Sequence, residues 1–104
     1  MNTQKMKIGV LTSGGDAPGM NAAIRAVVRT CVYRNIEVEG IFQGYQGMID
    51  GDFKKLNERS VARILGRGGT ILKSSRSKEF MTKEGRQKAF ENMKKHGVNA
   101  LITI

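Results

Sequence analysis

The sequence of 104 residues is long enough for one small domain, and its composition, 39% hydrophobic and 26% charged, is ordinary for a globular protein. No apolar run approaches the ~18 residues that a membrane helix requires, and the first residues lack the pattern of a secretory signal. The single cysteine, Cys31, excludes an intrachain disulfide and a cysteine metal cluster. We therefore expect a cytoplasmic protein without a membrane partner.

The net charge of +9 is unevenly distributed along the chain. Basic and acidic residues balance up to Phe53, so the whole excess lies between Lys54 and Lys95. An excess of this kind raises nucleic acid or acidic ligands as partners. Because the region has no packed basic run, and Phe80 and Phe90 do not interleave with its charges, a solvated surface or phosphorylated small molecules are favoured. A small basic nucleic-acid-binding domain remains the alternative from another class.

Hydrophobic patterning predicts a strand, a helix and a second strand in the first half. The apolar run from Lys7 to Leu11 predicts a buried strand. Apolar residues at helical spacing from Met20 to Cys31 predict a helix, with Asp16 as a candidate cap. The alternation over residues 37–42 predicts a strand, and the glycines of residues 44–51 predict turns.

The second half continues with helices and a strand. We expect a short helix over residues 60–65, then a loop, then a helix from about Thr82 to His96, with Ala89, Phe90 and Met93 on its inner face. Residues 100–104 predict a last strand. The alternation predicts an α/β fold, a three-layer Rossmann-like parallel sheet with helices on both faces. Because ligands of such sheets lie beyond the carboxyl ends of the strands, we expect a partial domain that continues past the last strand.

A glycine-rich segment, Leu11 to Asn21 (LTSGGDAPGMN), joins the first strand to the first helix. Glycines there let phosphates approach bare backbone, and the helix start offers free N–H groups. The segment matches neither the Walker loop nor the GxGxxG pattern. On these residues alone it is either a tight connection or a phosphate site, and Asp16 is either a helix cap or a catalytic or metal-binding group.

Arg25 and Arg29 lie four residues apart, on the helix face opposite the apolar residues. Like charges at this spacing repel by a few tenths of a kcal/mol, and an anion would relieve them. Arginine binds phosphate oxygens bidentately. The pattern is compatible with an exposed basic face or with a phosphate-binding pair.

The full string from Gly9 to Arg25 (GVLTSGGDAPGMNAAIR) resembles the opening of the ATP-dependent 6-phosphofructokinases. The resemblance continues in the same order through residues 39–47 (EGIFQGYQG), 67–72 (RGGTIL), 75–76 (SR) and 91–104 (ENMKKHGVNALITI). It implies a tail over residues 1–6. Residues 7–104 would then be the N-terminal part of the ATP-binding domain, truncated before a Gly-Gly-Asp-Gly-Ser loop that holds metal and nucleotide.

This resemblance implies a glycolytic kinase in the cytoplasm. Its parent transfers the γ-phosphoryl of ATP to fructose 6-phosphate, giving fructose 1,6-bisphosphate, as a homotetramer with Mg²⁺ held by residues beyond Ile104. No catalytic or metal-binding residue is expected in this chain, which alone should be inactive, and nucleic acid is not an expected partner. A pyrophosphate-dependent phosphofructokinase, which shares the opening motif, is the alternative.

The resemblance also assigns two sets of site residues. It implies that Gly15, Arg76 and Ser77 bind ATP. It implies that the effector, ADP as activator or phosphoenolpyruvate as inhibitor, binds to Arg25, Arg29, Glu58, Arg59 and Arg63. Relatives often carry an arginine, an aromatic residue and an acid at the last three positions, so this chain reverses the charge at Glu58 and at Arg63.

Overall fold

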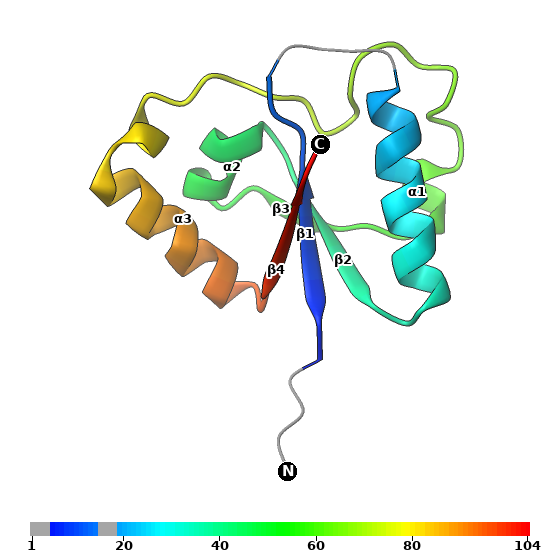
Figure 1. Ribbon diagram of the computed structural model, residues 1–104, viewed down its shortest axis with the longest axis horizontal. Helices are drawn as coiled ribbons and strands as arrows, with labels where there is room; N and C mark the ends of the chain where they lie inside the picture. Colours follow the sequence, from blue (N-terminus) through cyan, green and yellow to red (C-terminus); the bar gives the residue numbers. More distant parts are fainter. Residues whose placement is uncertain (1–4, 15–18) are drawn as a thin grey trace.

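A computed structural model describes residues 5–14 and 19–104. Its elements are β1 (Lys7–Leu11), α1 (Met20–Tyr33), β2 (Glu37–Ile41), α2 (Gly44–Asp50), β3 (Phe53–Lys55), 3₁₀ turns at Glu58–Val61 and Glu79–Met81, α3 (Lys83–Lys95) and β4 (Ala100–Thr103). The strand order is β3-β2-β1-β4. β1 is parallel to β2 and to β4, whereas β3 is an antiparallel edge strand. Figure 1 shows α1 on one side of the sheet and α2 and α3 on the other.

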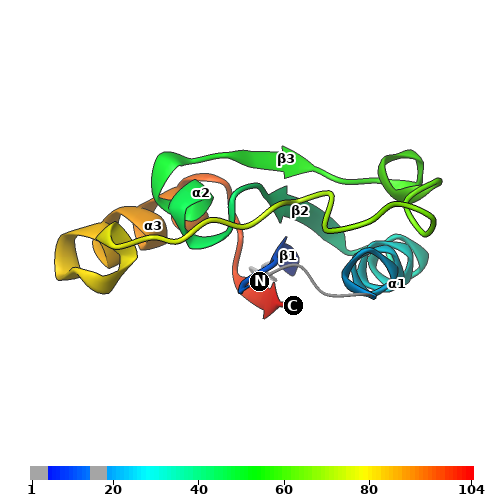
Figure 2. The ribbon, with the colours of Figure 1, turned by 90° about the horizontal axis from the view of Figure 1, so that it is seen from above.

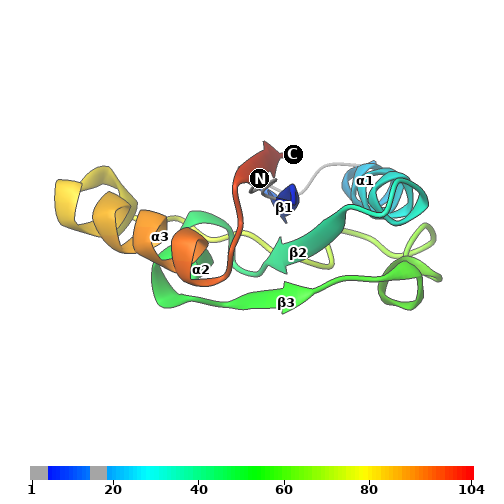
Figure 3. The ribbon, with the colours of Figure 1, turned by 90° about the horizontal axis from the view of Figure 1, so that it is seen from below.

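Each face of the sheet carries its own hydrophobic cluster. Along β1, Val10 packs with α1 and Leu11 packs with α2 and α3, because successive residues of a strand point to opposite faces. Figures 2 and 3 show the strands lying between the two helical layers. The predicted three-layer α/β fold is therefore confirmed.

α1 follows the predicted apolar pattern closely. Ile24, Val28 and Cys31 are buried against the sheet. Burial also raises the pKa of the Cys31 thiol, in keeping with a core residue. The helix cap predicted at Asp16 lies outside the described residues.

The prediction of turns over residues 44–51 is wrong, because α2 forms there. Tyr45, Met48 and Ile49 have helical spacing, and the last two are buried. Gly47 serves close packing, because a Cβ there would lie 1.5 Å from the carbonyl oxygen of Phe42, whereas Gly51, at φ +81°, ends the helix in a turn.

Three further expectations need correction. In place of the helix predicted over residues 60–65, the chain forms a single 3₁₀ turn at Glu58–Val61, and the Asn57 amide before it donates to the Ser60 hydroxyl at 3.1 Å. The sequence did not predict β3, because two of its three residues are lysines and no apolar alternation marks it. Both lysines are exposed, which is typical of an edge strand. Phe90 was expected on the inner face of α3 but is 56% exposed, whereas Gly85 and Ala89 are buried.

The amino ends of β1 and β4 meet the end of α3 in a group of internally paired charges. The Lys7 ammonium contacts the buried Glu39 carboxylate and donates to the His96 carbonyl at 2.7 Å. The His96 ring stacks on Phe53, with centroids 4.4 Å apart, and its Nδ1 lies 3.6 Å from Glu39. We call Lys7, Glu39 and His96 the paired cluster.

Candidate functional site

A hollow of about 560 Å³ lies at the carboxyl edge of the sheet, opposite the paired cluster. Ser13 and Gly14, which follow β1, form one wall and α2 forms another. The loop over residues 62–78 crosses above the strands (Figure 1), and we call it the crossing loop. We call it the Arg76 hollow. It is lined by Ser13, Gly14, Tyr45, Ser74, Ser75, Arg76 and Ser77.

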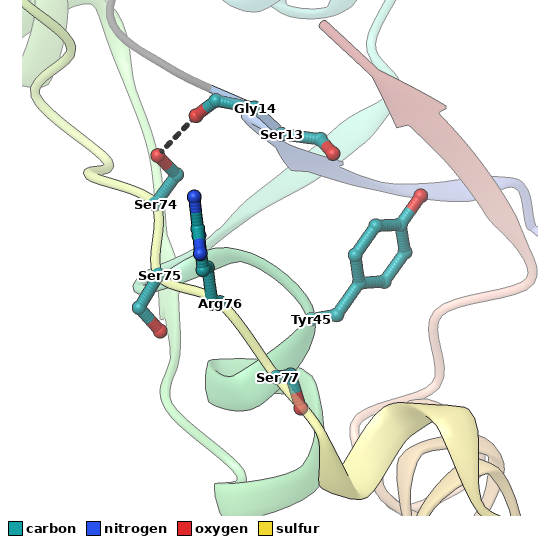
Figure 4. A pocket seen from close by; sticks show the side chains of 7 residues that line it. All are labelled: Ser13, Gly14, Tyr45, Ser74, Ser75, Arg76 and Ser77. Carbon is teal, nitrogen blue, oxygen red and sulfur yellow. Dashed lines mark hydrogen bonds between the residues drawn. The ribbon is translucent and has the colours of Figure 1, made fainter.

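The glycine-rich turn after β1 is fastened on two sides. The Ser13 amide donates to the carbonyl of Ile104 at 2.9 Å. The Ser74 hydroxyl donates to the carbonyl of Gly14 at 2.7 Å, as the dashed line in Figure 4 shows. Gly14 has φ +81°, a left-handed backbone that favours glycine. The turn and the crossing loop are therefore joined into one rim of the hollow.

The crossing loop is also held from below by the buried Thr12. Its hydroxyl donates to the carbonyl of Lys73 at 2.9 Å and hydrogen bonds to the Thr70 hydroxyl at 3.1 Å. The Gln43 amide donates to the carbonyl of Leu72 at 2.9 Å, and Leu72 is fully buried. These contacts fix the backbone that carries Arg76.

Asn21, in the first turn of α1, secures the start of the same loop. Its side-chain amide donates to the carbonyls of Ile64 and Arg67, at 3.3 and 3.2 Å, and its oxygen accepts from the Ile71 amide at 2.8 Å. Asn21 is 3% exposed. A buried polar side chain with three partners is the expected arrangement, because an unpaired one costs free energy.

α2 supplies the aromatic wall of the Arg76 hollow. Tyr45 stacks on Phe80, with ring centroids 4.4 Å apart. Gly44, at φ +60°, lets α2 begin close to β1, since a Cβ there would lie 3.1 Å from the carbonyl oxygen of Thr12. The Ser77 hydroxyl donates to Gln46 at 2.8 Å and accepts from the Phe80 amide at 3.0 Å, so it ties the crossing loop to α2.

Two of the three residues predicted for ATP lie together, and the third cannot be placed. Arg76 and Ser77 both line the hollow, and Arg76 extends toward Ser13 and Gly14 (Figure 4). Gly15 lies outside the described residues. No described acidic residue lines the hollow, and no ion pair in the described part of the chain involves Arg76. The hollow is therefore positively charged and rich in hydroxyl groups, which suits an anion.

Sequence reasoning missed Tyr45, Ser74 and Ser75 as lining residues, whereas Ser77 was predicted. Tyr45 lies among glycines that predicted turns, so the signal was its helical spacing with Met48 and Ile49. Ser74 gave no signal, because its contact with Gly14 joins segments 60 residues apart.

The residues predicted for the effector are partly brought together. α1 packs against the 3₁₀ turn at Glu58–Val61, and a hollow of about 350 Å³ lies between them. It is lined by Arg29, Thr30, Tyr33, Arg34 and Glu58. The exposed Arg59 and Arg63 do not line it.

Arg25, one turn before Arg29, has an unusual environment. Its Nε atom is buried and has no hydrogen-bond partner among the described residues. A buried donor without a partner is unfavourable, and an anion would supply the missing acceptor.

Other classes of site have little support in the described residues. Between residues 5–14 and 19–104, no group of three or more His, Cys, Asp or Glu side chains is placed to hold a metal ion. Within the same ranges, no helix combines the length and the apolar character needed to span a bilayer.

Comparison with known proteins gives a consistent result. The family model described as phosphofructokinase matches residues 7–104. An ATP-dependent 6-phosphofructokinase of Halothermothrix orenii is 61% identical over 98 residues, covering 94% of this chain and 30% of that protein. The ATP-dependent 6-phosphofructokinase 2 of Bacteroides thetaiotaomicron is 56% identical over 97 residues, again 30% of its length.

Solved structures agree with these relatives. A phosphofructokinase structure from Saccharomyces cerevisiae has a TM-score of 0.92 and 44% identity, and the match covers 95% of this chain and 14% of that chain. A Pichia pastoris phosphofructokinase in the T-state has the same TM-score with 42% identity, covering 99% of this chain and 12% of that one. The chain thus spans about 30% of the length of the curated relatives it matches. It belongs to the phosphofructokinase family.

Proposed function

We propose that this chain forms part of the nucleotide-phosphate site of an ATP-dependent 6-phosphofructokinase. The reaction is transfer of the γ-phosphoryl of ATP to fructose 6-phosphate, giving fructose 1,6-bisphosphate in glycolysis. The observation that carries the proposal is the Arg76 hollow, in which an unpaired arginine, a glycine turn and several hydroxyl groups meet without an acidic residue among those described. The names of the curated relatives support ATP rather than pyrophosphate as donor.

Within this site the residues have different roles. Phosphoryl transfer requires positioning and neutralisation of charge on the phosphoryl oxygens. Arg76 supplies that charge, and Gly15 is the bare-backbone position against which the phosphates lie. Ser77 acts by holding the crossing loop on α2 rather than by donating a free hydroxyl, because both its hydrogen bonds are internal.

Mg²⁺ does not fit the described residues by themselves. The ion is usually held by carboxylates together with substrate phosphates, and the lining of the Arg76 hollow offers hydroxyl groups and a guanidinium. We therefore assign Mg²⁺ to residues outside the described set. We further propose that the full protein is a cytoplasmic homotetramer, in which residues 7–104 form the start of the ATP-binding domain.

We also propose an effector site on α1. The unpartnered Nε of Arg25 and the hollow beside Arg29 and Glu58 support a ligand with phosphate groups, ADP or phosphoenolpyruvate. Arg59 and Arg63 would join it only by moving their exposed side chains. The acidic Glu58 on the hollow's wall favours a weaker response to anionic effectors than an arginine would give.

Turnover by the protein at its full natural length tests the main proposal. ATP should support phosphorylation of fructose 6-phosphate, followed in a coupled assay, and pyrophosphate should not. Gly15→Val should abolish ATP turnover, because a branched side chain would occupy the space of the phosphates. Gly66→Val is the matched control, since a Cβ at Gly66 meets nothing within 4 Å. Turnover with pyrophosphate alone, or full ATP activity in Gly15→Val, would contradict the proposal.

A further inference from the structure

A second hollow, of about 340 Å³, adjoins the Arg76 hollow. Ser74 lines both, so the two hollows meet at this residue. We call the second one the Lys73 hollow. It is lined by Gln43, Gly68, Gly69, Thr70, Lys73 and Ser74.

The backbone around the Lys73 hollow is strained. In residues 5–14 and 19–104, the non-glycine residues with positive φ are Asn35 (+58°), Gln43 (+68°) and Lys73 (+61°). Asn35 lies in the turn after α1, and asparagine tolerates this conformation. Glutamine and lysine do not share this tolerance, and both Gln43 and Lys73 line the Lys73 hollow. Glycine would adopt either backbone without strain.

Such strain persists only where the surroundings impose it, and it clusters at ligand sites. Here the surroundings are the buried contacts of the crossing loop: the Thr12 hydroxyl holds the carbonyl of Lys73, and Leu72 holds the amide of Gln43. The backbone of Lys73 is therefore held in place, whereas its side chain is exposed.

The charges around the hollow also support a ligand site. No described acidic residue lines it, and Lys73 takes part in no ion pair within the described ranges. On another wall, the backbone at Gly68 is uncovered, since a Cβ there would meet nothing within 4 Å. A cation beside bare backbone favours an anionic group.

We propose that the Lys73 hollow is an anion subsite that continues the Arg76 hollow across Ser74. Lys73 supplies its cation and binds a further phosphate of the same polyphosphate ligand, as lysine does elsewhere as a point charge. That the ligand is ATP rests on the proposed function, whereas the subsite itself requires only a chain of phosphates.

Calorimetric titration of the protein at its full natural length tests this, with ATP, AMP and inorganic tripolyphosphate as probes. Lys73→Met keeps the side-chain length and the backbone strain but removes the charge. The variant should bind ATP and tripolyphosphate about tenfold or more weakly than the parent, because it loses a charge-assisted contact. AMP affinity should not change, because AMP lacks the further phosphates of ATP that would reach the subsite.

Two further variants separate charge from structure. Lys73→Arg should retain the parent affinity for ATP, since it keeps the charge on a long side chain. Lys73→Gly should lose affinity as Lys73→Met does while its thermal midpoint does not fall, because glycine relieves the strain at φ +61°. Loss of affinity in all three variants together with a lower midpoint would show a purely structural role and overturn the subsite.

The remaining outcomes distinguish the two proposals. If the parent binds ATP and Lys73→Met binds it equally well, the subsite is wrong and the nucleotide site stands. If tripolyphosphate binds in a Lys73-dependent way and ATP does not bind, the subsite stands and the proposed function is wrong. If neither probe binds the parent, both are wrong.

Discussion

The two edges of the sheet use charged residues in opposite ways. At the amino edge, Lys7 and Glu39 are paired with each other and held by the end of α3. At the carboxyl edge, Lys73 and Arg76 have no acidic partner among the described residues and line open hollows. Charges that are satisfied internally serve the fold, whereas charges that are left without a partner beside a hollow are available to a ligand.

The largest expected effect comes from breaking the paired cluster. Glu39→Gln would leave the ammonium of Lys7 without its main counter-charge, and breaking a buried pair costs about 3 kcal/mol at the lower end of the usual range. The lower end applies because the Lys7 side chain is 22% exposed. Denaturant unfolding measures this loss.

The matched control is Glu37→Gln. Glu37 lies 3.9 Å from the same ammonium but its side chain is 55% exposed, so its removal should cost no more than about 1 kcal/mol. Equal losses in the two variants would mean that burial of the pair does not matter. ATP kinetics should be unchanged in both.

Asn21→Ala sharpens the comparison, because Asn21 is an internally satisfied residue at the carboxyl edge. The variant leaves the Ile71 amide and two carbonyls without their partner, which should cost about 2 kcal/mol in unfolding free energy. It should also raise the KM for ATP, since the loop that carries Arg76 loses its anchor. A stability loss without a change in KM would show that the loop keeps its position unaided.

Arg25→Ala tests a further cation, whose buried Nε has no hydrogen-bond partner among the described residues. If an effector anion binds the buried Nε, the effector affinity measured by calorimetry should fall about tenfold, or 1.4 kcal/mol. Turnover at saturating substrate should stay at the parent level. Lys55→Ala, exposed on β3, is the control and should change neither. Unaltered binding of ADP and phosphoenolpyruvate in Arg25→Ala would return Arg25 and Arg29 to an exposed basic face.

Patterns that depend on neighbours in sequence were the ones that could be predicted. The bounds of β1 and the buried face of α1 follow from local spacing, and the start of α3 follows from Thr82, whose hydroxyl accepts from the Gly85 amide at 2.9 Å. α2 was missed because its glycines, read locally, resemble turns, although one of them is required by contact with Phe42. β3 forms only because β2 is beside it, as the pairing of Phe53 with Ile41 shows.

The candidate site was predictable only in part. Family resemblance pointed to Arg76, and the structure places it on a hollow, but its role there remains a prediction. Ser74 and the Lys73 hollow depend on contacts between β1, α2 and the crossing loop, and no local pattern reports such contacts.

The central claim is that the unpaired charge of Arg76 serves the reaction and not the fold. The most direct measurement is kcat for ATP-dependent phosphorylation in Arg76→Ala, alongside its free energy of unfolding. Removing a group that stabilises developing charge should lower kcat about 10²- to 10³-fold. Because Arg76 makes no ion pair in the described part of the chain, stability should stay within about 0.5 kcal/mol of the parent. An unchanged kcat, or a loss of stability as large as that of Glu39→Gln, would contradict the account.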